Sequence, residues 1–283
     1  MTPFILPSDI LFLDTNICIK ICNAVSKNIS YSDMCYKLKY LKDKNRHTTI
    51  VFTFPYLLEG GHRKKERDYE TNINETLKDA NCIKNFFNAS VYDINIVKQM
   101  EIQRQNLGIG QSDFQFEKQI IFYESLHDII PCGKYKGKKI DIQNKIVDKA
   151  VECDLKLYYP IVISAIAVLY QDKNGKYAES FLKLKTQKNV SKNVVNDMVN
   201  ILRFSSSGYE FIIKCFPNAL QTCNIEFVTE DMELDRFIKC CNIQELHYFI
   251  KGKSNCSCLM NREYFPLASD AEWESLQNIF STI

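Results

Sequence analysis

The sequence predicts an α/β protein with a central, mostly parallel sheet and a large helical insertion. Two observations predict this class. Short apolar runs alternate with helical segments near the start of the chain, and another apolar run occurs late, at residues 225–229. Between these parts the pattern is almost wholly helical, so we expect a core of residues 1–62 and 190–283 and an insertion or lid of residues 63–189.

The first part of the core alternates strands and helices. Pro55 is expected to begin a helix after the second strand, because proline at the first helical turn lacks only an N–H that would have no intrahelical partner. The other expected elements are strands at about residues 10–14 and 48–54 and helices at about residues 16–26 and 31–43.

The insertion contains apolar positions spaced three and four residues apart, which is typical of amphipathic helices. Ser112 and Gln115 are expected to open one such helix as a capping box. The turn at residues 133–139 combines lysines with a tyrosine, so it either contacts phosphates or is a solvated loop. The apolar positions of the helix are Phe114, Ile120, Ile121, Tyr123, Leu126 and Ile129.

Residues 157–170 form the longest apolar stretch. It is shorter than the roughly 20 residues that span a bilayer, so we expect a helix buried in the core and no membrane contact. The final helix, opened by a capping box of Ser269 and Glu272, carries the only tryptophan, Trp273.

A further helix is expected at residues 192–203. We expect Asp197 near its first turn, where the positive end of the helix would help to keep the carboxylate ionised. The apolar stripe of this helix is Val194, Val195, Met198, Val199, Ile201 and Leu202.

Composition narrows the class of protein. The chain has 283 residues, of which 46% are hydrophobic and 25% are charged, and this excludes disordered and fibrous classes. The net charge of +2 does not by itself select nucleic acid as a partner.

The twelve cysteines are few for so long a chain, and no hydrophobic signal segment opens it, so a reducing, cytoplasmic setting is expected. Cys240-Cys241 and Cys256-Ser-Cys258 do not match the two-to-four-residue spacing typical of structural zinc sites, so buried or incidental thiols are the favoured interpretation.

Acidic side chains follow the predicted strands. Asp14 ends the first strand, Glu59 follows the second, and Glu230 and Asp231 come directly after Thr229. The carboxyl ends of parallel strands meet at one edge of a sheet, and clustered carboxylates bind Mg²⁺ or Mn²⁺. Such ions activate water for phosphodiester hydrolysis, and none of the four histidines is needed for it.

The same residues resemble the PIN domain nucleases. Asp14-Thr15-Asn16, Glu59, Asp197 and the run Val228-Thr229-Glu230-Asp231 match the order of acidic motifs in that family. The resemblance covers roughly residues 8–62 and 190–240 and implies a three-layer sandwich.

What the resemblance implies about the site can be stated residue by residue. Asp14, Glu59, Asp197 and Asp231 would be the catalytic ligands of Mg²⁺ or Mn²⁺. Asn16 and Thr229 would orient these ligands by hydrogen bonds, and Glu230 would bind through water. Asp154, which precedes the apolar helix, is a rival to Asp197.

Two functions from different classes follow. The first is a metal-dependent nuclease that hydrolyses single-stranded or structured nucleic acid, RNA rather than DNA. The second is a catalytically inactive PIN-like binding or scaffold module that docks a partner on its helical segment. Acids at all four positions favour catalysis, and Asn16 argues against a phosphohydrolase of the Asp-x-Asp type. A protein inhibitor, self-association and a toxin-like role stay open, the last by fold-level analogy alone.

Overall fold

The computed structural model describes eleven parts of the chain and divides it into two units. Unit 1 comprises Met1–Gly110 and Ser207–Glu230, and unit 2 comprises Gln111–Ser206 and Asp231–Ile283. The described residues are 9–44, 49–52, 69–87, 90–91, 115–131, 134, 136–171, 176–185, 190–203, 224–242 and 259–281. The division differs from the predicted domains, because residues 63–110 belong to the unit with the sheet and residues 231–283 belong to the other unit.

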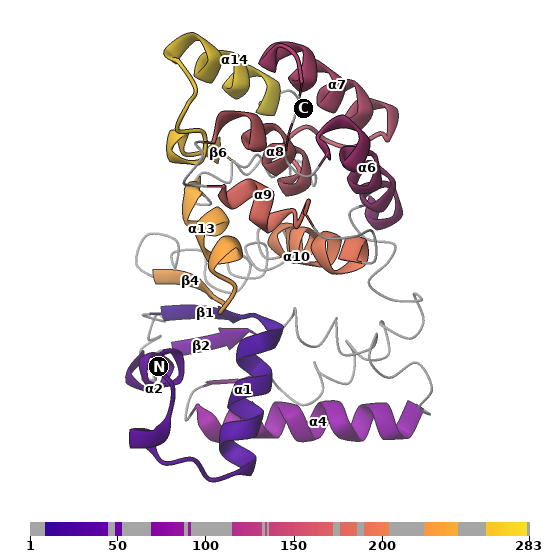
Figure 1. Ribbon diagram of the computed structural model, residues 1–283. Coiled ribbons are helices and arrows are strands. Elements are labelled where there is room, and N and C mark those ends of the chain that lie inside the picture. The colour runs from indigo at the N-terminus through magenta and orange to yellow at the C-terminus, as the bar shows by residue number, and fades with distance from the viewer. Residues whose placement is uncertain are drawn as a thin grey trace, which may run out of the picture. The chain divides into compact units, whose positions relative to one another are not determined.

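Unit 1 contains a four-stranded parallel sheet with the order β3-β2-β1-β4 (Figure 1). The α/β class is therefore confirmed. Strand β3 lies in the region predicted to be helical, and a strand of two residues is too short to give a periodic signal. The strands are β1 (Asp9–Leu13), β2 (Thr49–Phe52), β3 (Ser90–Val91) and β4 (Asn224–Val228).

The described helices of unit 1 pack on one face of this sheet. Leu11 and Leu13 point to the same face because side chains alternate along a strand, and both belong to a buried cluster with residues of these helices. Helices α1 and α4 pack against each other. The helices are α1 (Thr15–Ser26), α2 (Tyr36–Lys44) and α4 (Tyr69–Phe86).

The predicted strand at residues 10–14 and helix at residues 16–26 are confirmed by β1 and α1. The helix expected at residues 31–43 is confirmed only from Tyr36 onward. A 3-10 helix, η1 (Tyr31–Asp33), is followed by extended backbone at Met34, and α2 begins only at Tyr36. The helix expected to begin at Pro55 lies outside the described residues.

Helix α2 is tied to β4 by a polar contact. The Tyr40 hydroxyl donates to Oε2 of Glu226 at 2.6 Å, and Nζ of Lys44 lies 3.3 Å from the same oxygen. Burial and the hydrogen bond to Glu226 raise the pKa of Tyr40. Glu226 is in register with Leu11, so this carboxylate on the covered face has a donor and a cation beside it.

Unit 2 is built around α8 (Pro160–Ala167), all of whose residues are buried. The predicted buried helix at residues 157–170 is confirmed by α8 and by η5 (Val168–Tyr170). Helices α6, α7, α9 and α10 contact α8. The other elements are α6 (Phe116–Ile129), α7 (Lys139–Glu152), α9 (Tyr177–Phe181), α10 (Ser191–Arg203), α13 (Met232–Cys240), β5 (Cys241–Asn242), β6 (Leu259–Met260), η9 (Arg262–Tyr264) and α14 (Asp270–Phe280).

The ends of two helices test the capping predictions. Ser269 Oγ accepts from the Glu272 N–H, and Glu272 Oε2 accepts from the Ser269 N–H at 2.8 Å, so the predicted capping box of α14 is confirmed. The prediction for α6 is wrong. Its α-helix begins at Phe116, and Gln115 precedes it with a φ of 57° and no side-chain cap; Ser112 lies outside the described residues.

The burial of side chains shows which faces of α10 and α6 point into the protein. The apolar stripe predicted for residues 192–203 is confirmed, because all six of its side chains are buried in α10. On α6, Ile121 is 56% exposed and Phe122 is buried in its place.

No helix in the described ranges is long and apolar enough to cross a membrane. Cys240 is a buried free thiol, whereas Cys256 and Cys258 lie outside these ranges.

Candidate functional site

Asp14 joins the first strand to the first helix. Its backbone N–H donates to the Val228 carbonyl at 3.0 Å, which extends the pairing of β1 with β4 by one residue. Its carbonyl then accepts from the N–H groups of Ile17 and Cys18, and its side chain accepts from the Thr15 N–H at 2.7 Å. Extended backbone and a short acidic side chain suit the residue before a helix, so the Leu-Asp-Thr sequence ends the strand here.

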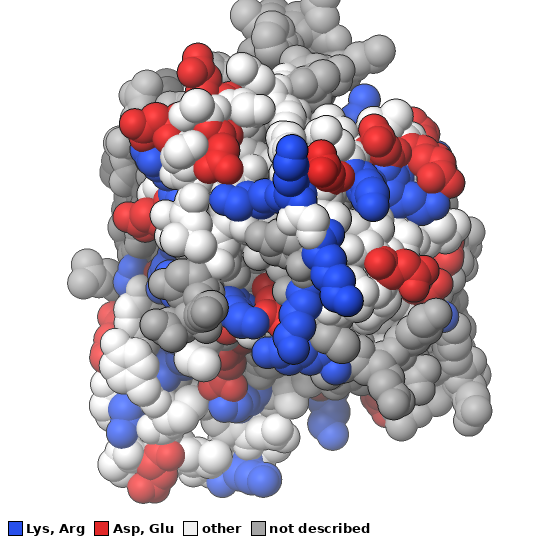
Figure 2. Space-filling model, turned by 45° about the horizontal axis from the view of Figure 1, so that its top comes forward, with Lys and Arg blue, Asp and Glu red and all other residues white. Residues whose placement is uncertain are grey.

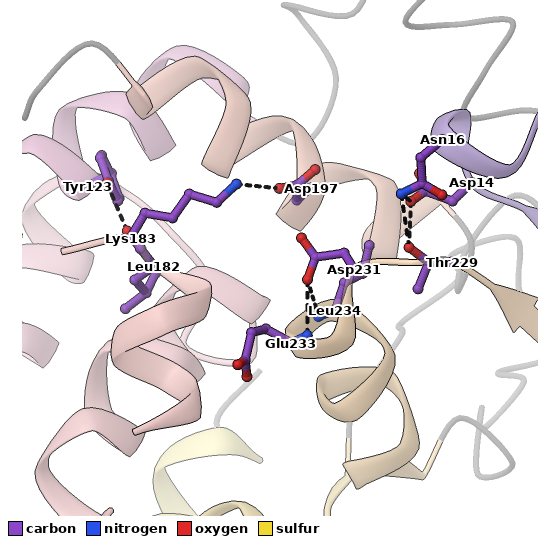
Figure 3. A network of polar contacts seen from close by, with 10 residues as sticks. All are labelled: Asp14, Asn16, Tyr123, Leu182, Lys183, Asp197, Thr229, Asp231, Glu233 and Leu234. Carbon is purple, nitrogen blue, oxygen red and sulfur yellow. Dashed lines mark hydrogen bonds and ion pairs between the residues drawn. The ribbon is translucent and has the colours of Figure 1, made fainter. Parts of the chain in front are cut away.

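Asn16 and Thr229 hold the Asp14 carboxylate (Figure 3). Oδ2 of Asp14 accepts from Asn16 Nδ2 at 2.7 Å and from the Thr229 hydroxyl at 2.6 Å. The same Asn16 nitrogen lies 3.3 Å from the Thr229 hydroxyl oxygen. Asp14 is 7% exposed and Thr229 is 1% exposed, so protein donors offset the loss of water around a buried carboxylate.

The network of Asp14, Asn16 and Thr229 lies at the carboxyl ends of β1 and β4. Strand β1 has β2 on one side and β4 on the other, so the strand order reverses between β1 and β4. Ligands of open parallel sheets bind outside the carboxyl ends of the strands at such a reversal. Asp14 follows β1 and Thr229 follows β4, so both lie at this edge.

Glu230 continues the edge. Its backbone N–H donates to Asn16 Oδ1 at 3.3 Å, and its carboxylate oxygens lie 2.5 and 2.6 Å from Nζ of Lys20 on α1. The hydrogen bond that Lys20 donates to Glu230 raises the pKa of Lys20, although desolvation opposes the rise. Lys20 is the residue that sequence reasoning missed. The sequence could have indicated Lys20, because it lies four residues after Asn16 and side chains with this spacing lie on one side of a helix.

Asp231 caps a helix of unit 2 (Figure 3). Its Oδ1 accepts from the N–H groups of Glu233 and Leu234, both at 3.0 Å, at the start of α13. Burial raises the pKa of Glu233, the Asp231 charge raises it further, and Arg236 opposes the rise. Asp231 therefore has a structural role in addition to the ligand role that the resemblance implies.

Asp197 lies in α10, also in unit 2. The prediction that it lies near the first turn is wrong, because α10 begins at Ser191 and its first turn contains no acid. The positive end of a helix acts mainly within the first turn, so it does little for this carboxylate. Oδ2 of Asp197 lies 3.6 Å from Nζ of Lys183, and both side chains are partly exposed (Figure 3).

The remaining candidates are Glu59 and Asp154. Glu59 lies outside the described residues. Asp154 has a left-handed φ of 55°, is 78% exposed and lies 2.7 Å from Nζ of Lys118. Because α8 begins only at Pro160, Asp154 is not an acid at the start of that helix.

The basic turn at residues 133–139 is in part engaged within unit 2. Nζ of Lys139 lies 4.5 Å from the centre of the Tyr170 ring and 3.3 Å from Oε1 of Glu272. Gly137 has a φ of 115°, a conformation that favours glycine. Gly133 and Tyr135 lie outside the described residues, so the phosphate-binding prediction for this turn stays a prediction.

Within the described ranges, no group of three or more histidine, cysteine, aspartate or glutamate side chains is placed to hold a metal ion. Comparison of the chain with protein-family models, with curated proteins and with solved structures gave no match in any of the three. Function must therefore be argued from the residues of the site itself.

Proposed function

We propose that this protein is a PIN-like metal-dependent nuclease that hydrolyses phosphodiester bonds of single-stranded or structured RNA. The observation that carries the proposal is the buried Asp14 carboxylate, oriented by Asn16 and Thr229 at the edge where β1 and β4 end. Two distant parts of the sequence, residues 14–16 and Thr229, thus hold one buried carboxylate at the place where parallel sheets bind ligands. In the PIN-like arrangement, helices would cover both faces of the sheet.

The chemistry of the donor set fits a hard divalent cation. Asp14 and the nearby Glu230 supply oxygen atoms only, as Mg²⁺ and Mn²⁺ prefer. We propose Glu59, Asp197 and Asp231 as the other ligands. When bound, the ion supplies an activated water and neutralises charge on the scissile phosphate.

The chain's own residues position the acid. Donors on both oxygens of Asp14 fix the plane of its carboxylate, and they come from the first turn of α1 and from Thr229, the residue that follows β4. Lys20 lies beside Glu230 at the same edge and can contact a phosphate oxygen of a substrate. Asn16 and Thr229 are therefore positioning residues, and Asp14 is the proposed catalytic residue.

A second candidate function is an inactive PIN-like binding or scaffold module. The observation in its favour is that three of the candidate acids already have partners within the protein. Glu230 pairs with Lys20, Asp197 pairs with Lys183, and Asp231 caps α13. In this case the carboxylates stabilise the fold, and partner docking on the helical unit replaces catalysis.

The test is cleavage of labelled single-stranded RNA and DNA in Mg²⁺ or Mn²⁺ by the full chain. Asp14→Asn keeps the shape and removes the charge, and Asp33→Asn is the matched control, since Asp33 is an exposed acid of the same unit. We expect metal-dependent cleavage of RNA by the wild type and by the control and none by Asp14→Asn. Absence of cleavage in all three proteins, or equal cleavage in all three, would favour the binding module.

A further inference from the structure

Residues 176–203 carry a net positive charge. This segment has five lysines and one arginine against two acids, a formal charge of +4, whereas the whole chain has +2. The rest of the chain is therefore slightly acidic. Figure 2 shows one face of the molecule, on which lysine and arginine side chains gather with acidic side chains among them.

A buried acid orients two of these lysines. Glu179 of α9 is 4% exposed, and its carboxylate oxygens lie 3.1 Å from Nζ of Lys176 and 3.3 Å from Nζ of Lys185. The lysine side chains are 38% and 65% exposed. Two cations thus share one negative charge that faces inward, so the charge presented to solvent is positive.

A cation–π pair joins α9 to α13. Cζ of Arg236, on α13, is 3.2 Å from the centre of the Tyr177 ring at the start of α9. Arg236 is exposed and Tyr177 is half-buried. A guanidinium on an aromatic face is a platform on which a base can stack, and its remaining N–H groups can bind phosphate.

We propose that Lys176, Tyr177, Lys185 and Arg236, here called the α9 basic surface, bind single-stranded nucleic acid. The lysines and the remaining N–H groups of Arg236 contact the backbone phosphates, and the Tyr177–Arg236 stack receives a base. The combination of cations with an aromatic stack distinguishes this partner from an acidic protein, which needs no stacking platform. The inference rests on the proposed function for its choice of partner, but it uses none of the proposed metal ligands.

The test is fluorescence anisotropy of a labelled oligouridylate with the full chain in EDTA, at several salt concentrations. The variant Lys185→Gln/Arg236→Gln removes two cations, and Lys145→Gln/Lys149→Gln on α7 removes two from another helix of the same unit. We expect weaker binding by the first variant. The slope of log affinity against log salt should fall by about 1.4, because each lost phosphate contact on a single strand accounts for about 0.7. The control should bind as the wild type does.

Two more variants separate binding from folding. Tyr177→Ala should weaken binding about fivefold or more through loss of stacking. Glu179→Gln keeps every cation and removes the shared negative charge, so it should bind at least as tightly as the wild type. Thermal unfolding of each variant checks that the chain is folded.

Equal affinity of Lys185→Gln/Arg236→Gln and the α7 control would overturn the inference. So would competition by polyglutamate as effective as competition by unlabelled oligouridylate, because that result indicates an acidic protein partner. Binding is measured without metal, so the outcome is independent of cleavage. If Asp14→Asn and the wild type both fail to cleave while the α9 variants lose binding, the nuclease proposal fails and this inference stands.

Discussion

Substitution of Thr229 by valine tests how Asp14 is held. Valine has nearly the same shape but lacks the hydroxyl that donates to Asp14 Oδ2 at 2.6 Å. A hydrogen bond to a charged group contributes about 1.5–3 kcal/mol, and Thr229 is 1% exposed, so no bulk water replaces the lost donor. We therefore expect the free energy of opening the β1–β4 edge to fall by about 2 kcal/mol.

Hydrogen exchange of peptides that cover β1 and β4 measures this locally. A loss of about 2 kcal/mol corresponds to about 30-fold faster exchange where opening is the limiting equilibrium. In an Asp14→Asn background the same substitution should cost about 1 kcal/mol less, because neutral hydrogen bonds are roughly half as strong as charged ones. An effect of Thr229→Val below about 0.5 kcal/mol, or an equal cost in both backgrounds, would refute this reasoning.

Three further predictions concern single side chains. Ser269→Ala removes the cap of α14 and should destabilise unit 2 by about 1 kcal/mol, measured by urea unfolding through Trp273 fluorescence. Burial and the Asp231 charge raise the pKa of Glu233 above its ordinary 4.5, so the folded state binds this proton more tightly than the unfolded state. The free energy of unfolding of unit 2 should therefore fall as the pH rises from below 4.5 through the raised pKa of Glu233. Urea titrations at several pH values measure this fall, and it should be smaller in Glu233→Gln. Lys20→Met leaves Glu230 without its ion-pair partner and should tighten Mn²⁺ binding severalfold, measured by calorimetry.

The Ser269 and Lys20 variants each have a matched control. Ser281→Ala changes an exposed serine at the other end of α14 and should leave the Trp273 transition within about 0.5 kcal/mol of wild type. Lys27→Met removes a cation at the far end of α1 and should not change Mn²⁺ binding. An unchanged midpoint for Ser269→Ala, an unchanged pH profile for Glu233→Gln, or weaker Mn²⁺ binding by Lys20→Met would contradict the respective argument.

The elements that carry Asp14 could be predicted because several local signals agree there. An apolar run of strand length ends in Asp14, a good helix-capping residue, and amphipathic spacing follows in α1. The strand before Thr229 is likewise marked by a short apolar run, and the start of α14 is marked by the capping residues Ser269 and Glu272. In each case neighbouring residues decide the structure, so the sequence pattern is sufficient.

Features that depend on tertiary contacts were not predictable from the pattern. Strand β3 exists because two residues pair with β2, and no periodicity marks them. The ion pair of Lys20 with Glu230 joins residues more than two hundred positions apart. Asp197 is a different case, because it lies beyond the first turn whether α10 begins at Ser191, as observed, or at residue 192, as expected, and its distance from the positive helix end could be counted from the sequence.

The most direct test of the central claim is Mn²⁺ binding to the full chain and to Asp14→Asn, by calorimetry or electron paramagnetic resonance. The central claim is that the acidic edge after β1 and β4 holds a divalent cation. The claim predicts saturable binding by the wild type and affinity at least tenfold lower in Asp14→Asn, because a ligand charge is lost. Equal binding by both proteins, or no binding by the wild type, would contradict it.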